Sequence, residues 1–134
     1  MGLDIAVVMD PIGSIKIAKD LERIGDYAKN IARYVIKNQH LPELLWEETR
    51  HLFELFFTNY DKVIKVVQTN DIALAYETAE ADEMIDETLK RVAMKVDFSN
   101  KEKVNVSFAT ISLLRNIERA GDHSKNICEH VIYR

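Results

Sequence analysis

A fifteen-residue segment occurs twice in this chain of 134 residues, and it constrains the fold more than any other feature. Residues 22–36 align without a gap to residues 118–132, at an offset of 96 positions (118 minus 22). Nine of the fifteen aligned residues are identical, among them a Glu-Arg-x-Gly-Asp sequence that is followed by Lys-Asn. Apolar periodicity alone would repeat isoleucines and valines, but not these polar residues. The repeat therefore indicates two equivalent helices that carry two equivalent polar sites.

Apolar residues recur at spacings of three and four throughout the chain, as is typical of amphipathic helices. The first such stripe consists of Leu21, Ile24, Ala28, Ile31 and Val35. Stripes of this kind pack helices at shallow angles. We therefore expect an all-α fold of four helices packed up and down, at about residues 12–37, 42–68, 71–96 and 101–134. Either Asn70 or Asp71 could cap the third helix.

The repeat also predicts how the chain divides. Residues 41–134 can form a complete three-helix bundle, whereas residues 1–40 hold only one further helix. We expect residues 1–40 to be the terminal helix of a first, incomplete repeat and residues 41–134 to be a complete second repeat. A bare apolar stripe is an assembly surface. The first helix should therefore bury its stripe on this bundle or on another copy of the chain.

Composition excludes several classes of function. The net charge is −4 and no stripe of Lys and Arg is present, so we expect no nucleic-acid partner. The single cysteine, Cys128, suits a reducing compartment. No uncharged apolar run of about 18 residues and no signal peptide are visible, so a cytoplasmic location is expected. The absence of a nucleophile–base pair and of a phosphate-binding glycine loop argues against an enzyme.

Each copy of the repeat places two carboxylates four residues apart on one face of a helix, away from its apolar stripe. The pairs are Glu22 with Asp26 and Glu118 with Asp122. Like charges at this spacing destabilise a helix by roughly 0.2–0.5 kcal/mol unless cations offset them. Surface ion pairs with lysines nearby are one explanation. Metal binding is the other, because hard cations prefer carboxylate oxygens.

A glycine lies between the two carboxylates in both copies, at Gly25 and Gly121. Glycine inside a helix costs roughly 0.8–1.0 kcal/mol relative to alanine. Ordinary surface ion pairs do not explain why this cost occurs twice. The position suggests that another group approaches the helix backbone closely there, which favours the metal interpretation.

The third helix carries a matching pair, Asp82 and Asp86. Asp82 falls at the edge of the apolar stripe, where an unpartnered carboxylate is costly. If the third and fourth helices are antiparallel neighbours, this pair could converge with Glu118 and Asp122 around an iron, manganese, magnesium or calcium ion. A solvated acidic face is the alternative, because this stretch holds several other glutamates.

Other candidate residues give weaker signals. Glu48-x-x-His51 is half of a di-iron bundle signature, but the second Glu-x-x-His is absent. His123 follows Asp122 and is a candidate supporting group for a metal ligand. Cys128 aligns with an alanine of the first copy, which indicates a small packed residue.

Residues 21–28 and 117–129 resemble the twin signatures of the PhoU family of phosphate-transport regulators. The resemblance covers about residues 15–133. It implies two three-helix bundles whose Glu/Asp-x-x-x-Asp motifs bind multinuclear metal clusters at the surface. Family members usually exceed two hundred residues, so this chain lacks the first two helices of the first bundle and has no acidic helix to match its first pair.

By resemblance, the metal ligands are expected to be Glu22, Asp26, Asp82, Asp86, Glu118 and Asp122. The expected ion is iron, with manganese, magnesium, zinc or calcium as alternatives. The resemblance also implies negative regulation of phosphate uptake and of phosphate-responsive signalling.

The implied partners are a phosphate ABC transporter and a sensor histidine kinase, with membrane contact only through these partners, and a homodimer or higher oligomer is expected. Two alternatives remain open from the sequence. They are a metal-free helical dimerisation module and a carboxylate-bundle metalloenzyme.

Overall fold

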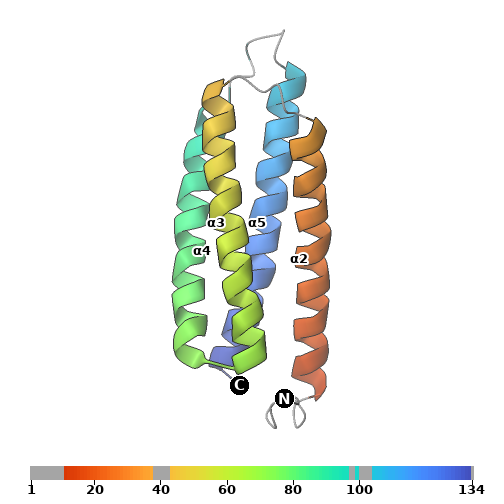
Figure 1. Ribbon diagram of the computed structural model, residues 1–134, viewed down its shortest axis with the longest axis vertical. Helices are drawn as coiled ribbons and strands as arrows, with labels where there is room; N and C mark the ends of the chain where they lie inside the picture. Colours follow the sequence, from red (N-terminus) through yellow and green to blue (C-terminus); the bar gives the residue numbers. More distant parts are fainter. Residues whose placement is uncertain (1–10, 38–42, 97–98, 100–103, 134) are drawn as a thin grey trace.

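The computed structural model describes residues 11–37, 43–96, 99 and 104–133. Four helices make up this part of the chain: α2 (Pro11–Lys37), α3 (Glu43–Thr69), α4 (Ile72–Met94) and α5 (Val104–Ile132). They run side by side as an up-and-down bundle, and the described ranges contain no strand (Figure 1). The predicted all-α fold is confirmed. The expected boundary between residues 40 and 41 lies outside the described residues, so the division into two units stays a prediction.

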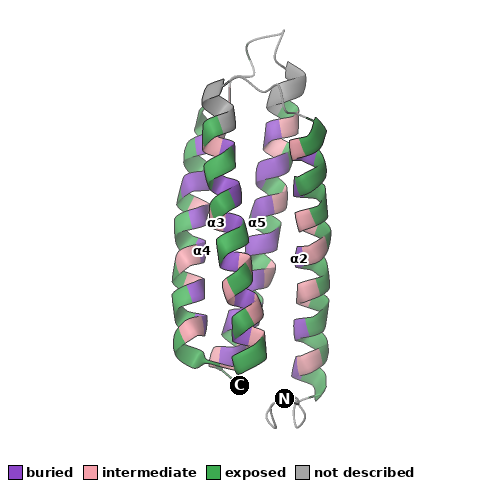
Figure 2. Cartoon of the chain, in the orientation of Figure 1, coloured by how far each residue is buried: buried purple, intermediate pink, exposed green. Residues whose placement is uncertain are grey.

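The core lies where the inward faces of the helices meet (Figure 2). Leu52, Val63, Leu113, Ile117 and Ile127 are among its fully buried side chains. These residues come from α3 and α5, and Ile85 and Leu89 extend the same core onto α4. None of the described helices combines the length and the low charge that crossing a membrane requires.

Helix α2 packs along α5 and belongs to the same core. Ile17, Ile24 and Ile31 are buried there, and Leu21, Ala28 and Val35 are partly buried against it. The apolar stripe of the first helix is thus covered by the chain's own bundle, one of the two outcomes expected. Tyr34, which the stripe did not include, is also buried. Its hydroxyl lies 3.1 Å from Thr110 Oγ1 on α5, and burial raises its pKa.

The two copies of the repeat lie antiparallel. Asn30 on α2 donates a 3.3 Å hydrogen bond to Asn116 on α5, and Tyr34 near the end of α2 meets Thr110 near the start of α5. Tyr27 and His123, which are equivalent positions of the repeat, stack on each other with ring centroids 5.9 Å apart. Two equivalent residues contact each other when a twofold axis passes between them. An approximate local twofold axis therefore relates α2 to α5.

Asp71 caps α4, which decides between the two candidate caps, Asn70 and Asp71. Its Oδ1 accepts a 3.1 Å hydrogen bond from the backbone N–H of Leu74. We expect Asp71→Ala to lower the free energy of unfolding by about 1 kcal/mol, because it leaves a helix N–H group without its acceptor. Asp71→Asn keeps an acceptor oxygen and should cost much less. Urea denaturation of both variants checks this expectation, and equal losses would contradict it.

Candidate metal centre

The candidate centre lies where α4 packs against α5. Asp82 of α4 is only 5% exposed, although it is a charged residue type. It rests against Gly121 of α5, where a Cβ atom would lie 2.6 Å from Asp82 Oδ1. Real Cβ atoms do not approach an oxygen so closely. The glycine of the second repeat therefore lets a carboxylate of α4 approach the α5 backbone, which is the kind of contact that the sequence suggested.

The carboxylates of α4 and α5 share one electrostatic environment. Burial, and after it the negative charges of Asp86 and Asp122, raise the pKa of Asp82 to about 7. The pKa of Asp86 is also raised, by burial and then by Asp122 and Glu118. Glu118 and Asp122 themselves are exposed. The four predicted ligands are thus close enough to repel one another, as the antiparallel packing of α4 and α5 predicts.

The four carboxylates are of the ligand type that binds a hard cation. Four carboxylates supply up to eight oxygen atoms, the ligand type that magnesium, manganese and calcium prefer. A bound cation would also offset the repulsion that raises the pKa of Asp82 and Asp86. Within the described ranges, however, no three acidic, histidine or cysteine side chains converge tightly enough to hold an ion. Metal binding at this site therefore needs the side chains to turn toward each other.

The first copy of the repeat has different surroundings. Glu22 and Asp26 are exposed on α2, and no atom lies within 4 Å of a Cβ built at Gly25. Asp82 packs against Gly121 on α5, but no described residue packs in the same way against Gly25 on α2. A metal site at Glu22 and Asp26 stays a prediction, as it was from the sequence.

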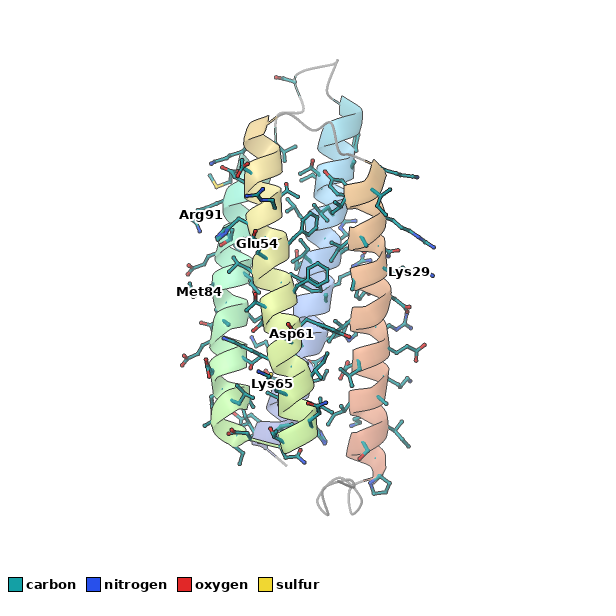
Figure 3. The ribbon with its side chains drawn as sticks, viewed as in Figure 1. Lys29, Glu54, Asp61, Lys65, Met84 and Arg91 are labelled. Atoms are coloured by element: carbon teal, nitrogen blue, oxygen red, sulfur yellow. The ribbon has the colours of Figure 1, made fainter. Side chains whose placement is uncertain are left out.

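The alternative explanation by surface ion pairs finds no support in the contacts. Five salt bridges occur among the described residues, and none of them includes a carboxylate of the two repeated pairs. Lys29, three residues after Asp26, projects from α2 away from the other helices (Figure 3). Among the residues that the structure describes, no Lys, Arg or His therefore forms a salt bridge with the repeated carboxylates.

The weaker candidates have other roles. Glu48 pairs with Lys95, and together with His51 these residues line a cavity of about 300 Å³ between α3 and α4. Cys128 is fully buried and burial raises its pKa to about 11, so it is the small packed residue that the alignment predicts.

His123 contacts α2, and its role as a supporting group for a metal ligand stays a prediction. His123 Nδ1 lies 2.7 Å from Asp20 Oδ1 on α2, and its ring stacks on Tyr27. Its partners are thus on α2 and not among the carboxylates of α4. Asp20 was not singled out in the sequence because it lies outside the repeated segment and aligns with Asn116.

The antiparallel repeat and the acidic face of α4 and α5 define a helical-bundle protein with a carboxylate site on its surface. The chain matches the family model described as the PhoU domain over residues 6–35 and 49–131. It belongs to the PhoU family. The match includes both copies of the repeat up to residues 35 and 131, together with Asp82 and Asp86.

Curated relatives agree with this membership. A PhoU homolog of Rhizobium meliloti is 33% identical over 138 residues, which cover 99% of this chain and 57% of the relative. A Thermotoga maritima homolog is 30% identical over 124 residues (89% and 53%), and one of Pseudomonas putida is 34% identical over 119 residues (85% and 46%). All three are named as accessory proteins of the phosphate-specific transport system. The chain thus spans about half the length of these relatives. No solved structure matches it.

Proposed function

We propose that this chain is a cytoplasmic regulatory component of a phosphate-transport system and that it lowers phosphate uptake when phosphate is plentiful. Family membership and the names of its relatives support this proposal. The proposed partners are the phosphate ABC transporter and the sensor histidine kinase that responds to phosphate. The chain acts by binding to these proteins and catalyses no reaction of its own.

We further propose that a metal ion at the face of α4 and α5 completes the regulatory surface. The observation that carries this step is the seating of Asp82 on Gly121, which holds a buried carboxylate among three others. Asp82, Asp86, Glu118 and Asp122 would hold the ion through their oxygens. A bound divalent or trivalent ion would neutralise this face and fix the packing of α4 against α5. Iron is the first candidate, and manganese, magnesium, zinc and calcium are the others.

A deletion strain of the source organism tests the regulatory role. We expect uptake of labelled phosphate in phosphate-rich medium to rise several-fold on deletion and to return to its former value on complementation. Co-purification of the tagged chain with the transporter tests the contact. Unchanged uptake together with no co-purification would contradict the role in transport.

Matched variants test the metal site. We expect Glu118→Gln/Asp122→Gln to lower bound metal, measured by elemental analysis, by at least tenfold, because the variant removes two of the four proposed ligands. Glu22→Gln/Asp26→Gln changes the equivalent positions of α2 and should leave most of the metal in place, because no atom lies within 4 Å of a Cβ built at Gly25, where Gly121 has Asp82.

Equal metal content in all three proteins would contradict the site on α4 and α5. A dimer that forms equally well with and without a chelator, with no metal bound at any stage, would favour the dimerisation module.

A further inference from the structure

A second polar site lies between α2 and α5, on a different set of residues from the acidic face. It is a cavity of about 450 Å³. Its lining is mainly cationic or basic: Lys16, Lys19, Arg23, His123 and His130. Small-molecule sites are typically about 300–1,000 Å³ in volume, so the cavity has the size of a ligand site. Its charge is unexpected in a chain whose net charge is −4.

The three cations that α2 contributes to this cavity form no salt bridge with a carboxylate among the described residues. Lys16, Lys19 and Arg23 are exposed, and none of them forms a salt bridge with a described residue. Among the described residues of the lining, Asp20 alone is acidic, and its Oδ1 lies 2.7 Å from His123 Nδ1. The carboxylate of Asp20 thus pairs with His123 of α5. The lysines and the arginine are left available to an anion from solution.

The spacing of these cations indicates the shape of the anion. Residues 16, 19 and 23 follow the spacing of one helix face, and seven residues of helix span about 10 Å. Three cations along that length match the charge and extent of a chain of two or three phosphate groups better than those of a single phosphate group. Arginine binds phosphate oxygens with two parallel hydrogen bonds. The apolar side chain of Ile17 lines the same cavity and gives the body of a ligand a surface to rest on.

The local twofold axis supplies a comparison within the molecule. The positions on α5 that are equivalent to Lys16, Lys19 and Arg23 are Ser112, Arg115 and Arg119. The positions on α2 that are equivalent to His123 and His130 are Tyr27 and Tyr34, and Tyr34 is buried against Thr110. The equivalent surface thus keeps two of the three cations but replaces the histidines with tyrosines. The basic cavity is a property of one end of the α2–α5 pair.

From these observations we propose that the cavity binds a small molecule that carries two or more phosphate groups, such as pyrophosphate or a nucleoside triphosphate. Lys16, Lys19 and Arg23 contact the phosphate groups, and Asn126 and His130 of α5 close the opposite side. The site is independent of the proposed metal centre, because none of the four carboxylates of α4 and α5 lines it.

Calorimetric titration of the metal-free full chain, in a buffer without divalent ions, tests the proposal. The probes are inorganic phosphate, pyrophosphate and ATP, and vesicles of phosphatidylcholine with phosphatidylglycerol serve as the lipid arm. We expect saturable binding of pyrophosphate or ATP at least tenfold tighter than that of inorganic phosphate. Omitting metal ensures that the acidic face cannot hold the anion through a bound ion, so failure of the metal proposal does not affect this result.

Matched double variants locate the site. Lys19→Ala/Arg23→Ala should weaken binding at least tenfold. Arg115→Ala/Arg119→Ala removes the same charge from the equivalent positions of α5 and should weaken it less than twofold. Circular dichroism establishes that both variants fold. Equal weakening by the two variants, or no saturable binding of any probe, would overturn the proposal. Binding to anionic vesicles alone would overturn the assignment to a small molecule.

Discussion

Gly121→Ala is expected to destabilise the protein, although alanine is the better helix former. Replacing glycine by alanine at an open helix position would raise the free energy of unfolding by about 1 kcal/mol. At Gly121, however, the new Cβ would lie 2.6 Å from Asp82 Oδ1, and Asp82 is almost fully buried. The carboxylate must move away from the α5 backbone. We expect a net loss of about 1–2 kcal/mol, as for other overpacked positions, and a large loss of bound metal.

Gly25→Ala is the matched control for this prediction. Gly25 is the equivalent residue of the first repeat, and no atom lies within 4 Å of a Cβ built there. Substitution should therefore stabilise the chain by about 0.5–1 kcal/mol through helix propensity alone. The two variants are compared by urea denaturation with EDTA present. If both of them stabilise the protein to the same extent, Asp82 does not rest against α5 in solution.

Asp82→Asn is expected to make the metal-free protein more stable at pH 8 but not at pH 4. The pKa of Asp82 is about 7 in the folded chain, against an ordinary value of 3.8. A raised acid pKa means that the folded state binds more protons than the unfolded state between these values. The free energy of unfolding therefore falls as pH rises from about 4 to 7. We expect a difference of roughly 2 kcal/mol in favour of Asp82→Asn at pH 8.

The sign of this effect should reverse when metal is present. A cation stabilises the ionised carboxylate, so saturating manganese should raise the stability of the native protein at pH 8, by about 3 kcal/mol at a hundredfold excess over Kd. Asp82→Asn should respond far less. Asp61→Asn serves as a control, because Asp61 is an exposed carboxylate of α3 (Figure 3). The difference in free energy of unfolding between the native protein and Asp82→Asn should change with pH. A difference that is the same at pH 4 and pH 8 would contradict the burial of Asp82 among other carboxylates.

Much of the fold could be predicted from local sequence. The apolar spacing predicted the four helices. The cap of α4 could be narrowed to Asn70 or Asp71, because Asn and Asp are among the few residue types that accept hydrogen bonds at a helix start. The contact between Asp82 and Gly121 could be anticipated in part. A repeated glycine between carboxylates indicates close approach, and Asp82 interrupts an apolar stripe. These signals are local, so one sequence is enough to show them.

The contacts of α2 could not be predicted in the same way. Its stripe fits the chain's own bundle or a second copy equally well, because apolar surfaces carry little information about their partner. The pairing of Asp20 with His123 joins residues 103 positions apart and depends on the antiparallel register of α2 and α5. The basic cavity depends on the same register, since its residues come from two helices that are distant in sequence.

The complete burial of Cys128 has a practical consequence for probing the protein. It is the only cysteine of the chain, and a thiol with a pKa of about 11 is almost entirely un-ionised near neutral pH. Alkylating reagents and fluorescent maleimides attack the thiolate. A cysteine introduced at an exposed position of the bundle would therefore react alone, so a dye or a spin label could follow each helix without first removing the native thiol.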